Sequence, residues 1–158
     1  IDNTLSDSYP SLTNRKKQSI LKNFFSESIR VLRIPFFENM TLIVKNRIKR
    51  KNVNIFFLSA RHRSLWVPTY FSLLLKIGLF HPKKLILVKN ADLKIKILER
   101  IISKFKNKKI CFIDDLSYGQ ESGEVQFYEK VVSFCRKNKS IIYFDKKIID
   151  SINSKEKK

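Results

Sequence analysis

Two adjacent carboxylates follow the most continuous apolar run in the C-terminal half of the chain. The run 110–113 leads directly into Asp114 and Asp115. A short, continuous apolar run is typical of a buried strand in a parallel sheet, and ligands bind at the carboxyl ends of such strands. Two carboxylates side by side suit a hard divalent cation that also contacts a phosphate. On this segment alone, the alternative is a solvated turn rich in Asp.

Two other apolar runs also end in polar residues. Ser59, Ala60 and Arg61 follow the run 53–58, and Lys89 follows the run 83–88. Strands that run parallel bring their carboxyl ends to one edge of a sheet, so these side chains are expected to lie near the two carboxylates. The alternatives are ordinary ones: Ser59 as a turn cap, Arg61 as the partner of a carboxylate, and Lys89 as a surface lysine.

The elements that must position these residues alternate along the chain. Apolar residues at helical spacing predict helices over about 15–32, 38–49, 64–78, 92–106 and 123–136. Apolar runs predict strands over 53–58, 83–88, 109–113 and 140–144. Strands that alternate with helices predict an α/β fold with a mostly parallel sheet covered on both faces. Gly78 is a suitable residue to end the helix that begins near residue 64.

Length and charge bound the class of protein. The chain of 158 residues predicts one domain, and its formal net charge of +19 raises the alternative of a nucleic-acid or membrane partner. The lysines are spread along the chain, which favours solvent-facing positions and does not favour nucleic acid. The apolar window 65–80 is too short to span a bilayer, and no signal-like leader opens the sequence, so a cytoplasmic protein is expected. Cys111 and Cys135 are predicted to be buried apolar residues.

Four short motifs in order resemble the haloacid dehalogenase-like (HAD) hydrolase superfamily. The segment 2–5, Asp-Asn-Thr-Leu, is similar to the end of its Asp-x-Asp-x-Thr signature. The strand that ends at Ser59 resembles the second motif, Lys89 fits the third-motif lysine, and Asp114-Asp115 fit the fourth. The resemblance covers nearly the whole chain and implies a Rossmann-like three-layer sandwich.

The resemblance also implies a role for each motif residue. In this superfamily phosphoryl transfer passes through an aspartyl-phosphate, so Asp2 would be the general acid and base, with its carbonyl as a magnesium ligand. Ser59 would bind a phosphoryl oxygen, and Lys89 would offset charge on the phosphate. Asp115 would hold Mg²⁺, with Asp114 as a second ligand or orienting neighbour. The substrate-binding positions would be Asn3, Thr4, Ala60 and Arg61.

The third-motif assignment has two rivals, because Lys94 and Lys96 also follow the strand 83–88. The first motif has a larger departure. The superfamily's nucleophilic Asp would stand immediately before Ile1, and the central strand that carries it would precede that position. We therefore expect an N-terminally incomplete piece of a longer phosphatase that is inactive by itself, with a natural pseudoenzyme as the alternative.

The domain prediction is a single HAD-like unit over 1–150, with a small helical cap insertion over about 11–50 and a charged tail over 151–158. The predicted function is magnesium-dependent hydrolysis of a phosphomonoester. A small cap leaves the site open, so the phosphorylated substrate is either a small molecule or a polynucleotide end. The rival predictions are a non-catalytic basic domain that binds nucleic acid or another polyanion through 45–51, and a catalytically inactive interaction domain.

Overall fold

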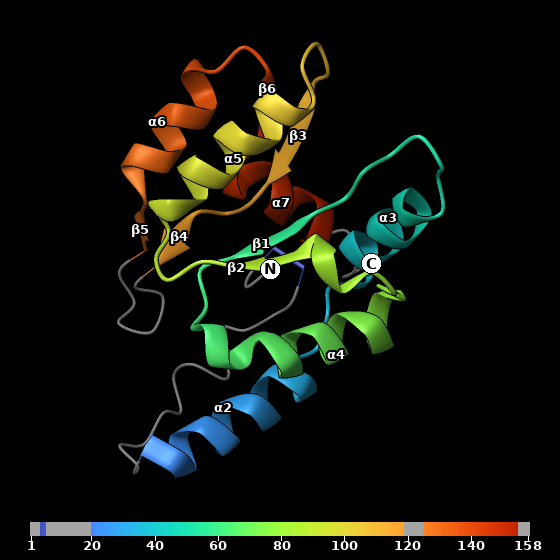
Figure 1. The fold of residues 1–158 in the computed structure, drawn as a ribbon, viewed down its shortest axis with the longest axis vertical. Coiled ribbons are helices and arrows are strands. Elements are labelled where there is room, and N and C mark those ends of the chain that lie inside the picture. The colour runs from blue at the N-terminus through green and yellow to red at the C-terminus, as the bar shows by residue number, and fades with distance from the viewer. Residues whose placement is uncertain (1–3, 6–19, 119–124, 155–158) are drawn as a thin grey trace.

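The structure of the chain is a computed structural model that describes residues 4–5, 20–118 and 125–154 (Figure 1). It is a mixed α/β fold with short parallel strands. Two of its helices precede all the strands among the described residues: α2 covers Ile20–Arg33 and α3 covers Glu38–Ile48. Both lie within the range 11–50 that was predicted to be helical. The predicted residues Asp2 and Asn3 lie outside the described part of the chain.

Two pairs of parallel strands form the centre of the molecule. Strand β1 (Phe57–Ser59) pairs with β2 (Leu85–Leu87), and β3 (Ile110–Ile113) pairs with β6 (Ile141–Phe144). Among the described residues, β1 and β3 are not paired with each other, so the expected continuous sheet is seen as two separate pairs. A third, antiparallel pair joins β4 (Ser117–Tyr118) to β5 (Gln126–Phe127).

Helices connect the parallel strands. After β1, a 3₁₀ turn at Arg63–Leu65 leads into α4 (Trp66–Ile77), which ends at Gly78 with a φ of +73°. The sequence therefore predicted the end of α4 correctly, because glycine adopts this left-handed conformation without a steric penalty. A second 3₁₀ turn, Pro82–Lys84, precedes β2. The remaining helices are α5 (Leu93–Lys104), α6 (Glu129–Lys137) and α7 (Lys146–Asn153).

Two apolar cores flank the strands. Successive residues of β1 enter different cores, Phe57 the first and Leu58 the second, because side chains alternate across a strand. In β3, Ile113 packs against the first core and Phe112 belongs to the second. The first core contains helix residues Met40, Leu73, Ile77 and Ile149, and the second contains Leu98, Val131, Val132 and Cys135.

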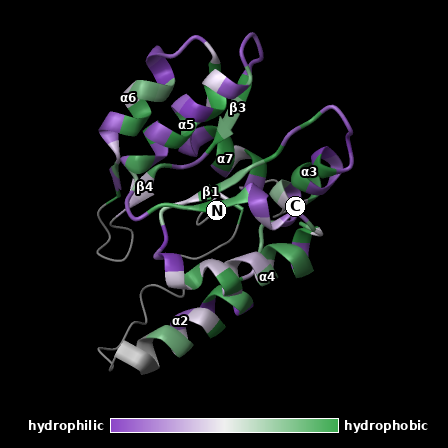
Figure 2. Ribbon diagram, viewed as in Figure 1, coloured by the Kyte–Doolittle hydropathy of each residue, from purple (hydrophilic) through white to green (hydrophobic). Residues whose placement is uncertain are grey.

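The two parallel pairs therefore lie between the same two groups of helices. Helices α3, α4 and α7 supply the first core, and α5 and α6 supply the second. In Figure 1, α5 and α6 lie together beside β3 and above β1 and β2, and α4 lies below β1 and β2 with α2 alongside. Figure 2 shows hydrophobic residues along β1 and β3, whereas the loop that directly follows α3 is hydrophilic. The strand tips are thus fixed by apolar packing on both faces.

Three sequence predictions need correction. Residues 151–153 belong to α7 and not to a tail, since Ile152 packs against the first core and its carbonyl accepts a hydrogen bond from Asn39 at 3.0 Å. Cys111 is exposed, although Cys135 is buried as predicted. The predicted helix over 123–136 begins only at Glu129, because β5 occupies 126–127. No helix in the described ranges is long and apolar enough to cross a membrane.

Candidate functional site

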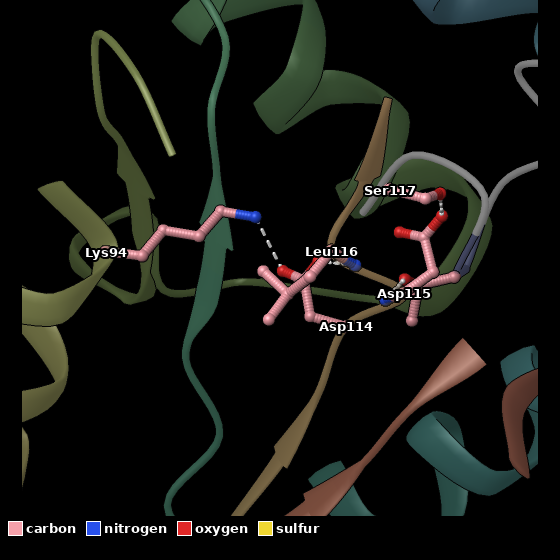
Figure 3. A network of polar contacts seen from close by, with 6 residues as sticks. Lys94, Asp114, Asp115, Leu116 and Ser117 are labelled. Atoms are coloured by element: carbon pink, nitrogen blue, oxygen red, sulfur yellow. Dashed lines mark hydrogen bonds and ion pairs between the residues drawn. The ribbon is translucent and has the colours of Figure 1, made fainter. Parts of the chain in front are cut away.

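Asp114 and Asp115 lie at the carboxyl end of β3 and are both buried, with 4% and 5% of their surface exposed. The chain turns sharply after them, at Leu116, whose φ is +48°. The Asp114 carboxylate stabilises this turn, since its Oδ1 accepts a hydrogen bond from the Leu116 amide at 3.0 Å. A non-glycine residue in the left-handed region needs such support from its surroundings. The turn directs the two carboxylates to different partners (Figure 3).

The first carboxylate is paired with a buried lysine. The Lys94 ammonium donates a hydrogen bond to Oδ2 of Asp114 at 2.7 Å, and Lys94 is only 6% exposed. Lys94 lies in the first turn of α5, where the Asn90 side chain accepts a hydrogen bond from the Leu93 amide at 3.1 Å. Burying a lone charge is costly, so each of these two ions requires the other.

Lys94 is therefore the lysine that the structure brings to the carboxylates. Lys89 and Lys96 are both exposed, and no ion pair joins either of them to Asp114 or Asp115 within the described residues. The sequence holds a signal that distinguishes the three. Lys94 lies four residues before buried Leu98 and so occupies the apolar face of α5, where a lysine needs a specific partner. The assignment of Lys89 as the third-motif lysine, based on its place between a strand and a helix, did not use this signal.

The second carboxylate has different surroundings. The hydroxyl of Ser117 donates a hydrogen bond to Oδ2 of Asp115, and the Asp115 amide donates to the Thr4 hydroxyl at 3.3 Å. Burial raises the pKa of the Asp115 carboxyl to about 6, and the charge of Asp114 acts in the same direction. The Ser117 hydrogen bond and the charge of Lys94 oppose this rise. A nearby cation would therefore stabilise the ionised form of the Asp115 carboxyl.

Thr4 attaches the N-terminal segment to this edge. It is buried, and the carbonyl of its neighbour Leu5 accepts a hydrogen bond from the Phe37 amide at 3.0 Å. Leu5 itself belongs to the first core. The predicted first and fourth motifs therefore meet at the Thr4–Asp115 contact, which links residues that are 111 positions apart. Asp2 and Asn3 lie outside the described residues.

The second predicted motif lies at the end of β1. Ser59 is buried, and its carbonyl accepts a hydrogen bond from the Val88 amide at 2.9 Å. Arg61 is buried, and its guanidinium donates a hydrogen bond to the buried Thr69 hydroxyl at 3.3 Å. Ala60 between them is exposed. Ser59 therefore lies at the carboxyl end of β1, in the same way that Asp114 lies at the carboxyl end of β3. Arg61 is instead bound to α4 through Thr69.

The donor set is only partly that of a magnesium site. Asp115 and Asp114 supply hard carboxylate oxygens, which Mg²⁺ prefers. However, Asp114 already holds Lys94, and the described residues include no group of three or more His, Cys, Asp or Glu side chains that could hold a metal ion. Asp115 could therefore supply one oxygen ligand to a cation, but the described residues do not supply a complete set of ligands.

Sequence reasoning missed Ser117 and the strand pair that begins with it. The strands β4 and β5 have two residues each, too few to produce a recognisable alternation of apolar and polar residues.

Comparisons with protein-family models, with characterised proteins and with solved structures found no match. The function must therefore be inferred from the geometry of the residues at the carboxyl ends of the strands.

Proposed function

We propose a magnesium-dependent phosphomonoester hydrolase function of the HAD type for this protein. The observation that supports the proposal is the buried ion pair of Lys94 and Asp114 beside the second carboxylate, Asp115. A lysine, a carboxylate that favours a cation and a strand-end location together suit a bound phosphate. We also propose that the two parallel strand pairs belong to one Rossmann-like sheet.

The proposed roles follow from where each group lies. Asp115 would hold Mg²⁺, which when bound neutralises charge on the transferring phosphoryl group. We assign the third-motif role to Lys94 and not to Lys89. The Lys94 ammonium lies in the buried site, where it would contact a phosphate oxygen beside Asp114. Asp114 fixes that ammonium in place. Ser59 remains the proposed donor to a phosphoryl oxygen.

The catalytic acid and the nucleophile depend on the N-terminal segment. In the HAD pattern Asp2 is the general acid, protonating the leaving oxygen, and the nucleophilic Asp stands two residues before it. The contact between Thr4 and the Asp115 amide would hold this segment at the carboxylates. The small helical insertion of α2 and α3 would leave the site open to either a small phosphate ester or a polynucleotide end.

The test is a phosphatase assay with p-nitrophenyl phosphate, with and without Mg²⁺. It is run on the 158-residue chain and on a longer chain extended before Ile1 so that an Asp stands two residues before Asp2. We expect magnesium-dependent release of phosphate from the longer chain, lost on replacing that added Asp with Asn. Absence of turnover in both, together with salt-sensitive binding of single-stranded DNA, would instead support the basic polyanion-binding domain.

A further inference from the structure

The β4–β5 hairpin places an aromatic ring next to the candidate site. Ser117 and Phe127 are directly opposite each other in the antiparallel pair. Side chains that are directly opposite project from the same face of the pair, with Cβ atoms about 4.5–5.5 Å apart. Because the Ser117 hydroxyl donates a hydrogen bond to Asp115, the face that carries Phe127 is the face that borders the carboxylate.

Phe127 differs from the other aromatic residues of the hairpin in its packing. The rings of Tyr118 and Tyr128 lie 4.6 Å apart, and Tyr128 packs against the second core. The Tyr128 amide also donates a hydrogen bond to the Leu116 carbonyl at 3.0 Å, which ties the hairpin to the turn after the carboxylates. Phe127 belongs to neither core, is 39% exposed, and forms no ring contact with the described residues.

An exposed phenylalanine by itself is common on protein surfaces. Here its position matters. Phe127 lies opposite Ser117 in the strand pair, and the Ser117 hydroxyl contacts Asp115, a carboxylate that favours a cation. A phosphate bound at Asp115 would therefore lie on the side of the strand pair that carries this ring, and its leaving group could extend toward it. An aromatic ring of the leaving group can stack on Phe127, whereas a purely polar leaving group gains nothing from it.

We propose that Phe127 is a specificity-determining residue that contacts a planar aromatic ring in the leaving group. The substrates of this site are then aromatic phosphomonoesters, either nucleoside monophosphates or aryl phosphates. The inference rests on the proposed function only for the location of the phosphate. Its test is therefore a comparison of affinities, with turnover recorded separately.

The experiment compares two pairs of ligands that differ in the ring. Adenosine 5′-monophosphate and ribose 5-phosphate differ by the base, and O-phosphotyrosine and O-phosphoserine differ by the phenol ring. Dissociation constants are measured by titration calorimetry of the 158-residue chain in Mg²⁺, with phosphate release followed in the same samples. We expect the aromatic member of at least one pair to bind about tenfold more tightly, as base–aromatic stacking supplies.

Two variants assign the preference to the ring. With Phe127→Ala, the two dissociation constants of each pair should differ by no more than about twofold. Phe127→Leu should keep only a part of the difference, because leucine is apolar but has no π-face. Phe80→Ala is the matched control: Phe80 is even more exposed, at 75%, but precedes β2 and so lies toward the amino ends of the strands. Thermal melts establish that each variant is folded.

The outcomes separate the sources of the ring and the two proposals. If only the nucleotide pair shows a preference, the ring that Phe127 contacts is a nucleobase. If only the amino-acid pair shows one, the ring is an aryl group, and if both pairs do, Phe127 accepts any aromatic ring. Equal affinities within both pairs, no binding of any probe, or a preference that survives Phe127→Ala would overturn the inference. Preference without phosphate release, even from the longer chain, would contradict the hydrolase proposal alone, and release without preference would contradict the role of Phe127 alone.

Discussion

The Lys94 ammonium and the Asp114 carboxylate lie 2.7 Å apart although the two residues are 20 positions apart in the sequence. One stands at the start of α5 and the other at the end of β3, so their contact links a helix to a strand at the carboxyl edge. Both ions are almost completely removed from water. Each is therefore stable as an ion mainly because the other is present.

Loss of the lysine should destabilise the fold strongly. Lys94→Met leaves the Asp114 charge buried without its cation, and breaking such a pair costs about 3–5 kcal/mol. Urea denaturation should report this loss in the free energy of unfolding. The exposed neighbour provides the control, since Lys96→Met should change stability by no more than about 0.5 kcal/mol. If Lys94→Met and Lys96→Met unfold at the same urea concentration, the pair does not stabilise the protein.

Removal of both charges gives a sharper version of the same test. Replacing a buried ion pair with apolar residues of similar volume is often neutral or stabilising. Lys94→Met combined with Asp114→Leu should therefore be more stable than Lys94→Met alone, although Asp114→Leu also removes the acceptor for the Leu116 amide. A double variant that is less stable than the single one would show that the turn at Leu116 is the main contribution of Asp114.

The buried Asp115 carboxyl should make stability depend on pH. Its pKa is raised by burial from 3.8 to about 6, so the folded state binds more protons than the unfolded state between these values. Stability from this group is then fully present below pH 3.8 and is lost as the pH rises through about 6. Asp115→Asn should remove this loss and, without Mg²⁺, stabilise the protein at pH 7.5 by about 1–3 kcal/mol.

Thermal melts at pH 5 and pH 7.5, with and without Mg²⁺, provide the measurement. Addition of Mg²⁺ at the higher pH should raise the melting temperature of the unchanged chain, because a bound cation stabilises the ionised carboxylate. It should not raise that of Asp115→Asn. An equal effect of Mg²⁺ on both chains would exclude Asp115 as a ligand.

Turnover should distinguish the three lysines that the sequence left open. In the longer chain of the phosphatase assay, Lys94→Arg keeps a positive charge at Asp114 but displaces it, and should reduce kcat/KM about 100-fold or more. Lys89→Arg and Lys96→Arg should remain within about threefold of the unchanged enzyme, because both residues are exposed. A large loss confined to Lys89→Arg would return the third-motif role to that residue.

The two cysteines should differ in their reactivity. Cys111 is exposed, although burial of part of its side chain raises the pKa of its thiol, whereas Cys135 is 1% exposed and burial raises the pKa of its thiol to about 12. Because the thiolate is the reactive form, Ellman's reagent should modify one thiol in the folded chain and both thiols in guanidinium chloride. Cys111→Ser should abolish the reaction of the folded chain. A fast reaction of both thiols without denaturant would show that α6 opens readily.

Local patterns explain which parts of the fold were predictable. Helix α5 was predicted to within two residues, since its apolar positions recur at helical spacing, and the end of α4 was fixed by Gly78. The strand predicted over 53–58 exists only as Phe57–Ser59, because its partner β2 has three residues. A strand requires hydrogen bonds from a neighbour, and the length of that neighbour is not a local property of the sequence.

By itself the sequence determined the order of the longer helices and of the four parallel strands, and placed two carboxylates after a strand, because both depend on the spacing of apolar residues. Only the tertiary structure decided that Lys94, not Lys89, meets Asp114, that Cys111 is exposed, and that Phe127 stands opposite Ser117. These are contacts between elements. They depend on how helices and strands pack over distances of many residues, which the spacing within one element does not record.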